Sequence, residues 1–207
     1  MSSLVTGMAH DDAMPSRDTV VIARFPSELS ELQADVRSYA KRIFARHGAE
    51  EWKATVLTCE LHRHLGTYSI VGAKMGIRAR ELLGASLDEL RVESHAGSKP
   101  PLSCLNDGLQ VSTGASLGRG TINVVVDGTQ RCEAVFTHNG KRLHLRLKPD
   151  VAARITAELA ALVKRHGGTP LAYFSDVRAQ SLRHWLELDR REVFEEVTTG
   201  SGNVPER

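Results

Sequence analysis

The 207 residues, of which 41% are hydrophobic and 25% charged, match the size and composition of one globular domain, and no stretch is apolar enough to cross a membrane. A formal net charge of only +2, with no aromatic residues inside a basic run, argues against nucleic-acid binding. The three cysteines form no Cys-x-x-Cys pair, which argues against a disulfide framework and a site of paired cysteines. Any metal ion would need a mixed set of ligands.

The chain begins with residues 1–18, which contain no apolar segment of the kind found in a secretory signal. We therefore expect a disordered tail and a cytoplasmic protein. Residues 19–25 form a short apolar run that predicts an edge strand, and Ser27 then caps a helix that ends at Gly48. Residues 52–61 suit either a strand or the start of a helix.

A further helix is predicted to end at Leu83, with Gly84 just beyond it as the C-terminal cap. Gly72 and Gly76 lie about one turn apart inside this helix, where each glycine costs roughly 1 kcal/mol relative to alanine. Such a pair predicts close packing against another helix or backbone, and one alternative is packing across a subunit boundary.

The second half of the chain changes its hydrophobic period. Residues 91–94 predict a strand, and a helix should follow from Cys104 to about Ser112. The hydrophobic period then becomes two, which predicts a three-stranded antiparallel meander with strands at residues 121–126, 130–137 and 142–147. Two helices should follow, beginning at Pro149 and Ser175. We divide the chain into a tail (1–18), an α+β core domain (19–150), a helical extension (151–197) and a disordered tail (198–207).

Two short stretches carry the residues most suited to chemistry. His62 and His64 can face the same side only if their segment is extended or irregular. On a helix, two residues separated by one other residue point to nearly opposite faces. Cys104 and Asp107 are three residues apart, which one helical turn brings onto one face. Imidazole, thiolate and carboxylate are the usual ligands of zinc and similar transition metals. Cys59 is an alternative thiolate, although a buried core thiol is the simpler interpretation.

These stretches together resemble one known family. The run His62-Arg63-His64-Leu65-Gly66, the run from Gly72 to Gly76 and the run from Cys104 to Gly120 are similar to the FmdE domain family, which is named after formylmethanofuran dehydrogenase. The resemblance covers about residues 40–150. Two positions depart from the family pattern: Arg63 replaces a usual glycine, and Ala115 replaces a usual second cysteine. The chain also has no cysteine after Cys132, so the C-terminal zinc finger of many members is missing.

The resemblance implies an α+β sandwich, with helices packed on a mixed, mostly antiparallel sheet and C-terminal helices added, in an intertwined homodimer. It also implies a divalent transition metal, most simply zinc, held by His62, His64 and Cys104. Asp107 would be a further ligand, a residue that orients a ligand, or a general base in catalysis. Gln110 and Thr113 are candidates for substrate binding through hydrogen bonds. Arg63 and Lys99 could attract an anionic substrate.

Three functions remain open from the sequence. The first is a metal-binding accessory protein of one-carbon or metallocofactor metabolism that serves a larger oxidoreductase complex. The second is a free-standing metal-dependent hydrolase or lyase that acts on a small anionic substrate. The third is a dimer that binds a tetrapyrrole or delivers a metal.

Overall fold

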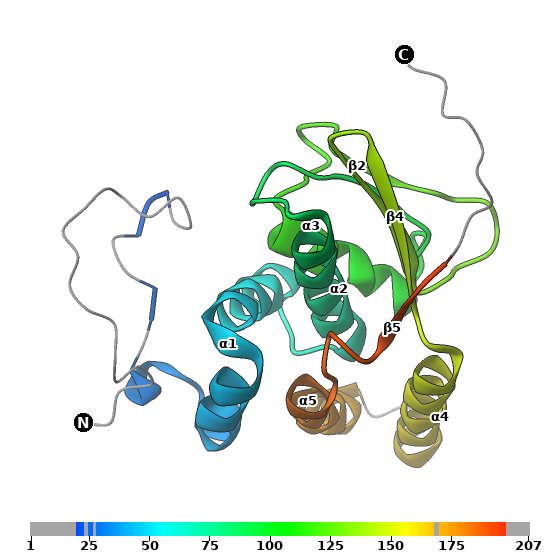
Figure 1. Ribbon diagram of the computed structural model, residues 1–207. Helices are drawn as coiled ribbons and strands as arrows, with labels where there is room; N and C mark the ends of the chain where they lie inside the picture. Colours follow the sequence, from blue (N-terminus) through cyan, green and yellow to red (C-terminus); the bar gives the residue numbers. More distant parts are fainter. Residues whose placement is uncertain (1–19, 23–24, 27, 168–169, 198–207) are drawn as a thin grey trace.

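The computed structural model describes residues 20–22, 25–26, 28–167 and 170–197. The two predicted disordered tails and the predicted cap Ser27 therefore lie outside the described residues. The structure is an α+β arrangement of helices beside a five-stranded mixed sheet, as predicted (Figure 1). In chain order the elements are η1 (Leu29–Glu31), α1 (Ala34–His62), α2 (Thr67–Leu83), β1 (Arg91–Ser94), η2 (Leu102–Cys104), α3 (Leu105–Thr113), β2 (Ile122–Val124), β3 (Glu133–His138), β4 (Lys141–Leu147), α4 (Pro149–His166), α5 (Pro170–Glu187) and β5 (Phe194–Glu196).

The first part of the chain confirms one prediction and corrects another. The regular helix ends at Gly48, as predicted, because this glycine has the non-helical angles φ 84° and ψ 172°; a second helical stretch follows this kink within α1 and continues to His62. Residues 52–61 are therefore helical, which settles the open alternative. The predicted strand at 19–25 is wrong in its described residues, which adopt no strand. Val20 and Val21 are 99% and 93% exposed, so no sheet edge pairs with them or covers them.

Helices α2 and α3 pack closely through glycine, as the sequence predicted. A Cβ added at Gly72 would lie 2.1 Å from the carbonyl oxygen of Leu105, and one at Gly108 would lie 2.1 Å from the carbonyl oxygen of Ser69. The backbones therefore touch where these side chains are missing. The side of α2 that carries Gly72 packs on α3 of the same chain. It therefore does not support packing across a subunit boundary. The homodimer stays a prediction.

The sheet has the strand order β2-β1-β3-β4-β5. β1 is parallel to β2, and the remaining neighbours are antiparallel. The hairpin of β3 and β4 formed as predicted, but the three-strand meander is wrong, because β1 lies between β2 and β3. The segment from Val125 to Cys132 is too long for a tight hairpin, and it carries the chain past β1. Val92, Phe136 and Leu143 lie side by side across the strands and are buried in the core.

The C-terminal part of the chain joins both the helices and the sheet. Helix α4 begins at Pro149 as predicted, whereas α5 begins at Pro170, earlier than the predicted Ser175. Trp185 of α5 stacks on Trp52 of α1, with ring centroids 5.0 Å apart. Strand β5, which the sequence pattern does not predict, pairs with β4 at the edge of the sheet. Among the described helices, none is both long and apolar enough to cross a membrane.

We expect the buried histidines of this helical layer to make folding sensitive to acid. His47 and His184 are 3% and 2% exposed, and desolvation lowers the pKa of each below the ordinary 6.5. Below about pH 6.5 the unfolded chain binds protons that the folded chain does not, so the free energy of unfolding should fall as the pH falls. Between about pH 6.5 and 7.5 it should stay level. Urea unfolding at pH 7.5, 6.5 and 5.5 measures this, and a midpoint independent of pH would contradict it.

Candidate functional site

His62 and His64 lie on either side of the point where α1 ends. His62 is the last helical residue, and Arg63 then takes a left-handed backbone conformation, with φ 66°. The chain is therefore irregular between the two histidines, which is the condition for both to face one side. Their rings lie together, with centroids 4.2 Å apart and a tilt of 36°.

Gly66 shows where the two imidazoles point. A Cβ added to this glycine would lie 3.1 Å from Nε2 of His64 and 3.4 Å from Nε2 of His62. Both Nε2 atoms therefore approach one point beside the Gly66 backbone. Helix α2 begins directly after this glycine, and its Ser69 hydroxyl donates to the Gly66 carbonyl at 2.8 Å. The glycine leaves room for the pair, and the helix start holds the backbone in place.

Asp107 holds His62 from the opposite side of its ring. The Nδ1–H of His62 donates to Oδ2 of Asp107 at 2.6 Å. Asp107 lies in the first turn of α3, which the glycine contacts fix against α2. A carboxylate at Nδ1 sets the tautomer that leaves Nε2 with its lone pair free. Nε2 of His62 is buried and has no hydrogen-bond partner among the described residues.

The environment of His64 favours a neutral imidazole. Desolvation lowers the pKa of His64, and the neighbouring imidazole of His62 lowers it further. The edge of the Phe174 ring of α5 also packs against it, with centroids 5.8 Å apart and an angle of 72°. A neutral imidazole is the form that binds metal ions. Phe174 was not identified from the sequence, because only the fold brings α5 to this place.

A cavity of about 500 Å³ lies beside His62 and contains most of the predicted site. Its walls include His62, Cys104, Asp107 and Gln110. Burial raises the pKa of the Cys104 thiol, and the nearby Asp107 carboxylate raises it further, so the thiol is protonated at neutral pH. The side-chain oxygen of Gln110 accepts a hydrogen bond from the Leu117 N–H at 3.3 Å. His62, Cys104, Asp107 and Gln110 therefore share one cavity.

Thr113, the remaining predicted contact to substrate, serves the helix end instead. It is fully buried, and its hydroxyl donates to the Leu109 carbonyl at 2.6 Å and accepts from the Ala115 N–H at 3.1 Å. It is not part of the cavity wall. The hydroxyl is therefore used to close the last turn of α3, and a role in substrate binding has no support in this geometry.

The predicted ligand set fits a metal ion only in part. Within the part of the chain that the structure describes, no group of three or more His, Cys, Asp or Glu side chains is arranged to hold a metal ion. Two imidazoles with a carboxylate behind one of them do fit a metal, whereas Cys104 does not join them in a three-residue group. Cys59 lines a different cavity, and burial raises the pKa of its thiol to about 12.

Comparison with known families finds a match that includes this site. The profile of FmdE, described as "Molybdenum formylmethanofuran dehydrogenase operon", matches residues 61–195. The chain belongs to the FmdE family. The FmdE match begins one residue before His62 and ends in β5, so it includes the site, nearly the whole sheet and both C-terminal helices. It covers residues 61–150 of the predicted 40–150 region, leaves out residues 40–60, and continues to residue 195. A comparison with curated proteins found no match.

Proposed function

We propose that this FmdE-family protein binds a divalent transition metal, most simply zinc, through Nε2 of His62 and Nε2 of His64. The observation that carries the proposal is the Nε2 atom of His62, which is buried and unpartnered beside the second imidazole while Asp107 holds Nδ1. A buried nitrogen without a partner costs about 1–3 kcal/mol. A metal ion bound between the two Nε2 atoms would satisfy both nitrogens at once.

Cys104 is the proposed third ligand, because it lines the same cavity as His62. A metal ion favours the thiolate, which offsets the effect of burial on the thiol pKa. The remaining coordination positions would then face the cavity of about 500 Å³. A bound metal would supply a Lewis acid there, and this chain's own groups would orient and desolvate whatever enters.

We further propose that the protein is a cytoplasmic accessory protein of one-carbon metabolism related to formylmethanofuran dehydrogenase. The support is the family description, which names the operon of that molybdenum enzyme. A larger oxidoreductase would be the partner that contacts the metal.

We also propose that the protein acts as a homodimer. Light scattering should then give twice the chain mass at micromolar concentration, and a monomeric mass would contradict the dimer.

Equilibrium dialysis against zinc, followed by elemental analysis, tests the metal proposal. We expect about one zinc per chain in the wild type and little in His62→Ala or His64→Ala. His138→Ala is the matched control, because this histidine lies in the β3–β4 hairpin and lines neither cavity. Circular dichroism should show that all the variants are folded. Equal zinc content in all four proteins would overturn the proposal.

Asp107→Asn should weaken zinc binding by roughly 10- to 100-fold while the protein stays folded, because a carboxylate that orients a ligating imidazole typically contributes that much to affinity. Competition with a chromophoric chelator measures the dissociation constant. Asp150→Asn, an exposed carboxylate in the first turn of α4, is the control. An unchanged affinity in Asp107→Asn would show that the hydrogen bond to His62 has no part in metal binding.

A further inference from the structure

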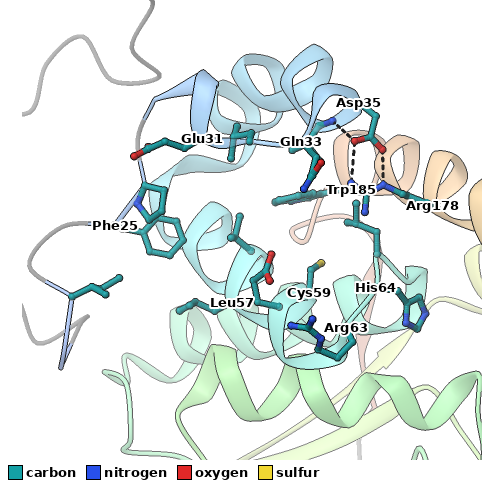
Figure 2. Close-up of a pocket in the computed structure, with 17 residues that line it drawn as sticks. Phe25, Glu31, Gln33, Asp35, Leu57, Cys59, Arg63, His64, Arg178 and Trp185 are labelled. Atoms are coloured by element: carbon teal, nitrogen blue, oxygen red, sulfur yellow. Dashed lines mark hydrogen bonds and ion pairs between the residues drawn. The ribbon is translucent and has the colours of Figure 1, made fainter.

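A second cavity, of about 730 Å³, lies on the His64 side of the histidine pair (Figure 2). It is bounded by α1, α5 and the chain before η1. Most of its wall is apolar and comes from side chains far apart in the sequence: Phe25, Leu32, Val36, Val56, Leu65 and Trp185. Cavities of this size with mostly apolar walls and a few polar groups are typical of small-molecule sites.

The charged groups of this wall are not equivalent. Asp35 and Arg178 neutralise each other through a two-pronged ion pair, with N–O distances of 2.5 and 3.0 Å. Glu31, Glu60 and Arg63 also line the cavity. Glu31 accepts a hydrogen bond from the Glu28 N–H, whereas within the described residues neither Arg63 nor Glu60 forms an ion pair or a side-chain hydrogen bond. Figure 2 shows the Arg63 side chain on the same wall as Cys59 and Leu57, while the His64 ring turns away from it. Among the described residues of this wall, Arg63 is thus a guanidinium without an ion pair beside an apolar interior.

Arg63 also has a backbone conformation that is unfavourable for a residue with a side chain. With φ 66° and ψ 8°, the residue has a left-handed conformation, which glycine adopts freely and other residues adopt at a cost. An arginine here is less favourable for folding than a glycine would be, and no ion pair of its side chain offsets the difference. Strained positions of this kind are concentrated at binding sites.

We infer that this cavity binds a small amphipathic carboxylate, with its anionic group at Arg63 and its apolar body against Trp185 and the neighbouring side chains. The inference goes beyond the metal proposal, because it needs neither the Nε2 atoms of the histidines nor a metal ion. Arg63 selects for the negative charge, and the carboxylate of Glu60 opposes it. The apolar interior supplies most of the binding energy.

The protein contains its own reporter for this site. Its two tryptophans are the stacked pair Trp52 and Trp185, and Trp185 lines the cavity. Octanoate and its neutral analogue octanol can therefore be titrated by tryptophan fluorescence, in the presence of EDTA so that no metal takes part. We expect the wild type to bind octanoate about fivefold more tightly than octanol.

Arg63→Gly separates a binding role from a structural one. It should remove the preference for octanoate over octanol and, at the same time, raise the unfolding midpoint by roughly 2–4 °C, because glycine fits the left-handed backbone. Arg63→Lys should keep most of the preference. Glu60→Gln should bind octanoate at least as tightly as the wild type, since it removes a negative charge from the wall.

Three results would overturn the inference. The first is equal affinity of the wild type for octanoate and octanol, or no binding of octanoate. The second is an Arg63→Gly variant that keeps the preference for the anion. The third is a loss of octanoate binding in Glu60→Gln as large as in Arg63→Gly, because the end of α1 rather than its positive charge would then be responsible. None of these results depends on whether His62 and His64 bind zinc.

Discussion

Replacing Gly72 or Gly108 with alanine should lower the free energy of unfolding by roughly 3 kcal/mol or more, because each new methyl group would meet backbone that cannot move aside. The Cβ positions would lie 2.1 Å from the carbonyl oxygens of Leu105 and Ser69, respectively. The only relief is to separate α2 from α3. Since α3 carries Asp107, the same variants should also bind zinc more weakly than the wild type.

Gly118→Ala is the matched control for this prediction. A Cβ at this position meets no atom within 4 Å, and its backbone is not in the left-handed region. Its stability should therefore equal that of the wild type or exceed it by a few tenths of a kcal/mol. Urea unfolding of the three variants decides the matter. A Gly72→Ala or Gly108→Ala protein as stable as Gly118→Ala would show that the two helices are not in backbone contact.

Glu51→Ala should have a comparable effect, with a loss of about 3–5 kcal/mol in the free energy of unfolding. Glu51 is fully buried between two cations: its carboxylate pairs with Lys74 Nζ at 2.5 Å and with Arg190 Nη1 at 3.0 Å. These contacts join α1, α2 and the segment after α5. Burial already lowers the pKa of Lys74 to about 8 despite the attraction of Glu51. Removing the carboxylate would leave both cations buried without it.

The neighbouring residue provides the control. Glu50 pairs with Arg80 at 2.6 Å, but its side chain is 59% exposed. Glu50→Ala should therefore cost no more than about 1 kcal/mol. The double variant Glu51→Ala with Lys74→Met should recover part of the loss, because it also removes one of the two buried charges. Urea unfolding measures these changes in the free energy of unfolding. Equal losses in Glu50→Ala and Glu51→Ala would contradict the claim that the buried carboxylate of Glu51 stabilises the fold.

The helices and the β3–β4 hairpin could be predicted because their signals are local. Pro149 starts α4, Gly84 caps α2, and Asn139 and Gly140 form a two-residue turn. The order of strands could not be predicted in the same way. Nothing near residues 122–124 shows that this strand pairs with β1 rather than with β3, because the choice depends on residues that are distant in sequence. Strand β5 is short and carries two glutamates, so its alternation gives almost no signal.

The candidate site could be predicted only in part, because some of its signals are local and others depend on the fold. The spacing of His62 and His64 allowed the two imidazoles to face one side if their segment was extended or irregular, and the structure shows the two rings together. The three-residue spacing from Cys104 and the family resemblance both pointed to Asp107, which contacts His62. The helix-closing hydrogen bonds of Thr113 could not be predicted, because in the sequence a threonine that closes a helix looks the same as one that binds a ligand. The ligand role of Cys104 stays a prediction.

X-ray absorption spectroscopy at the zinc edge of the zinc-loaded wild type tests the central claim most directly. We predict the scattering pattern of two imidazoles in the wild type, with zinc–nitrogen distances of ~2.0–2.1 Å. A sulfur shell at ~2.3 Å would identify Cys104 as the third ligand. A wild-type spectrum with no imidazole scattering, unchanged in His62→Ala and His64→Ala, would contradict a metal site at the His62–His64 pair.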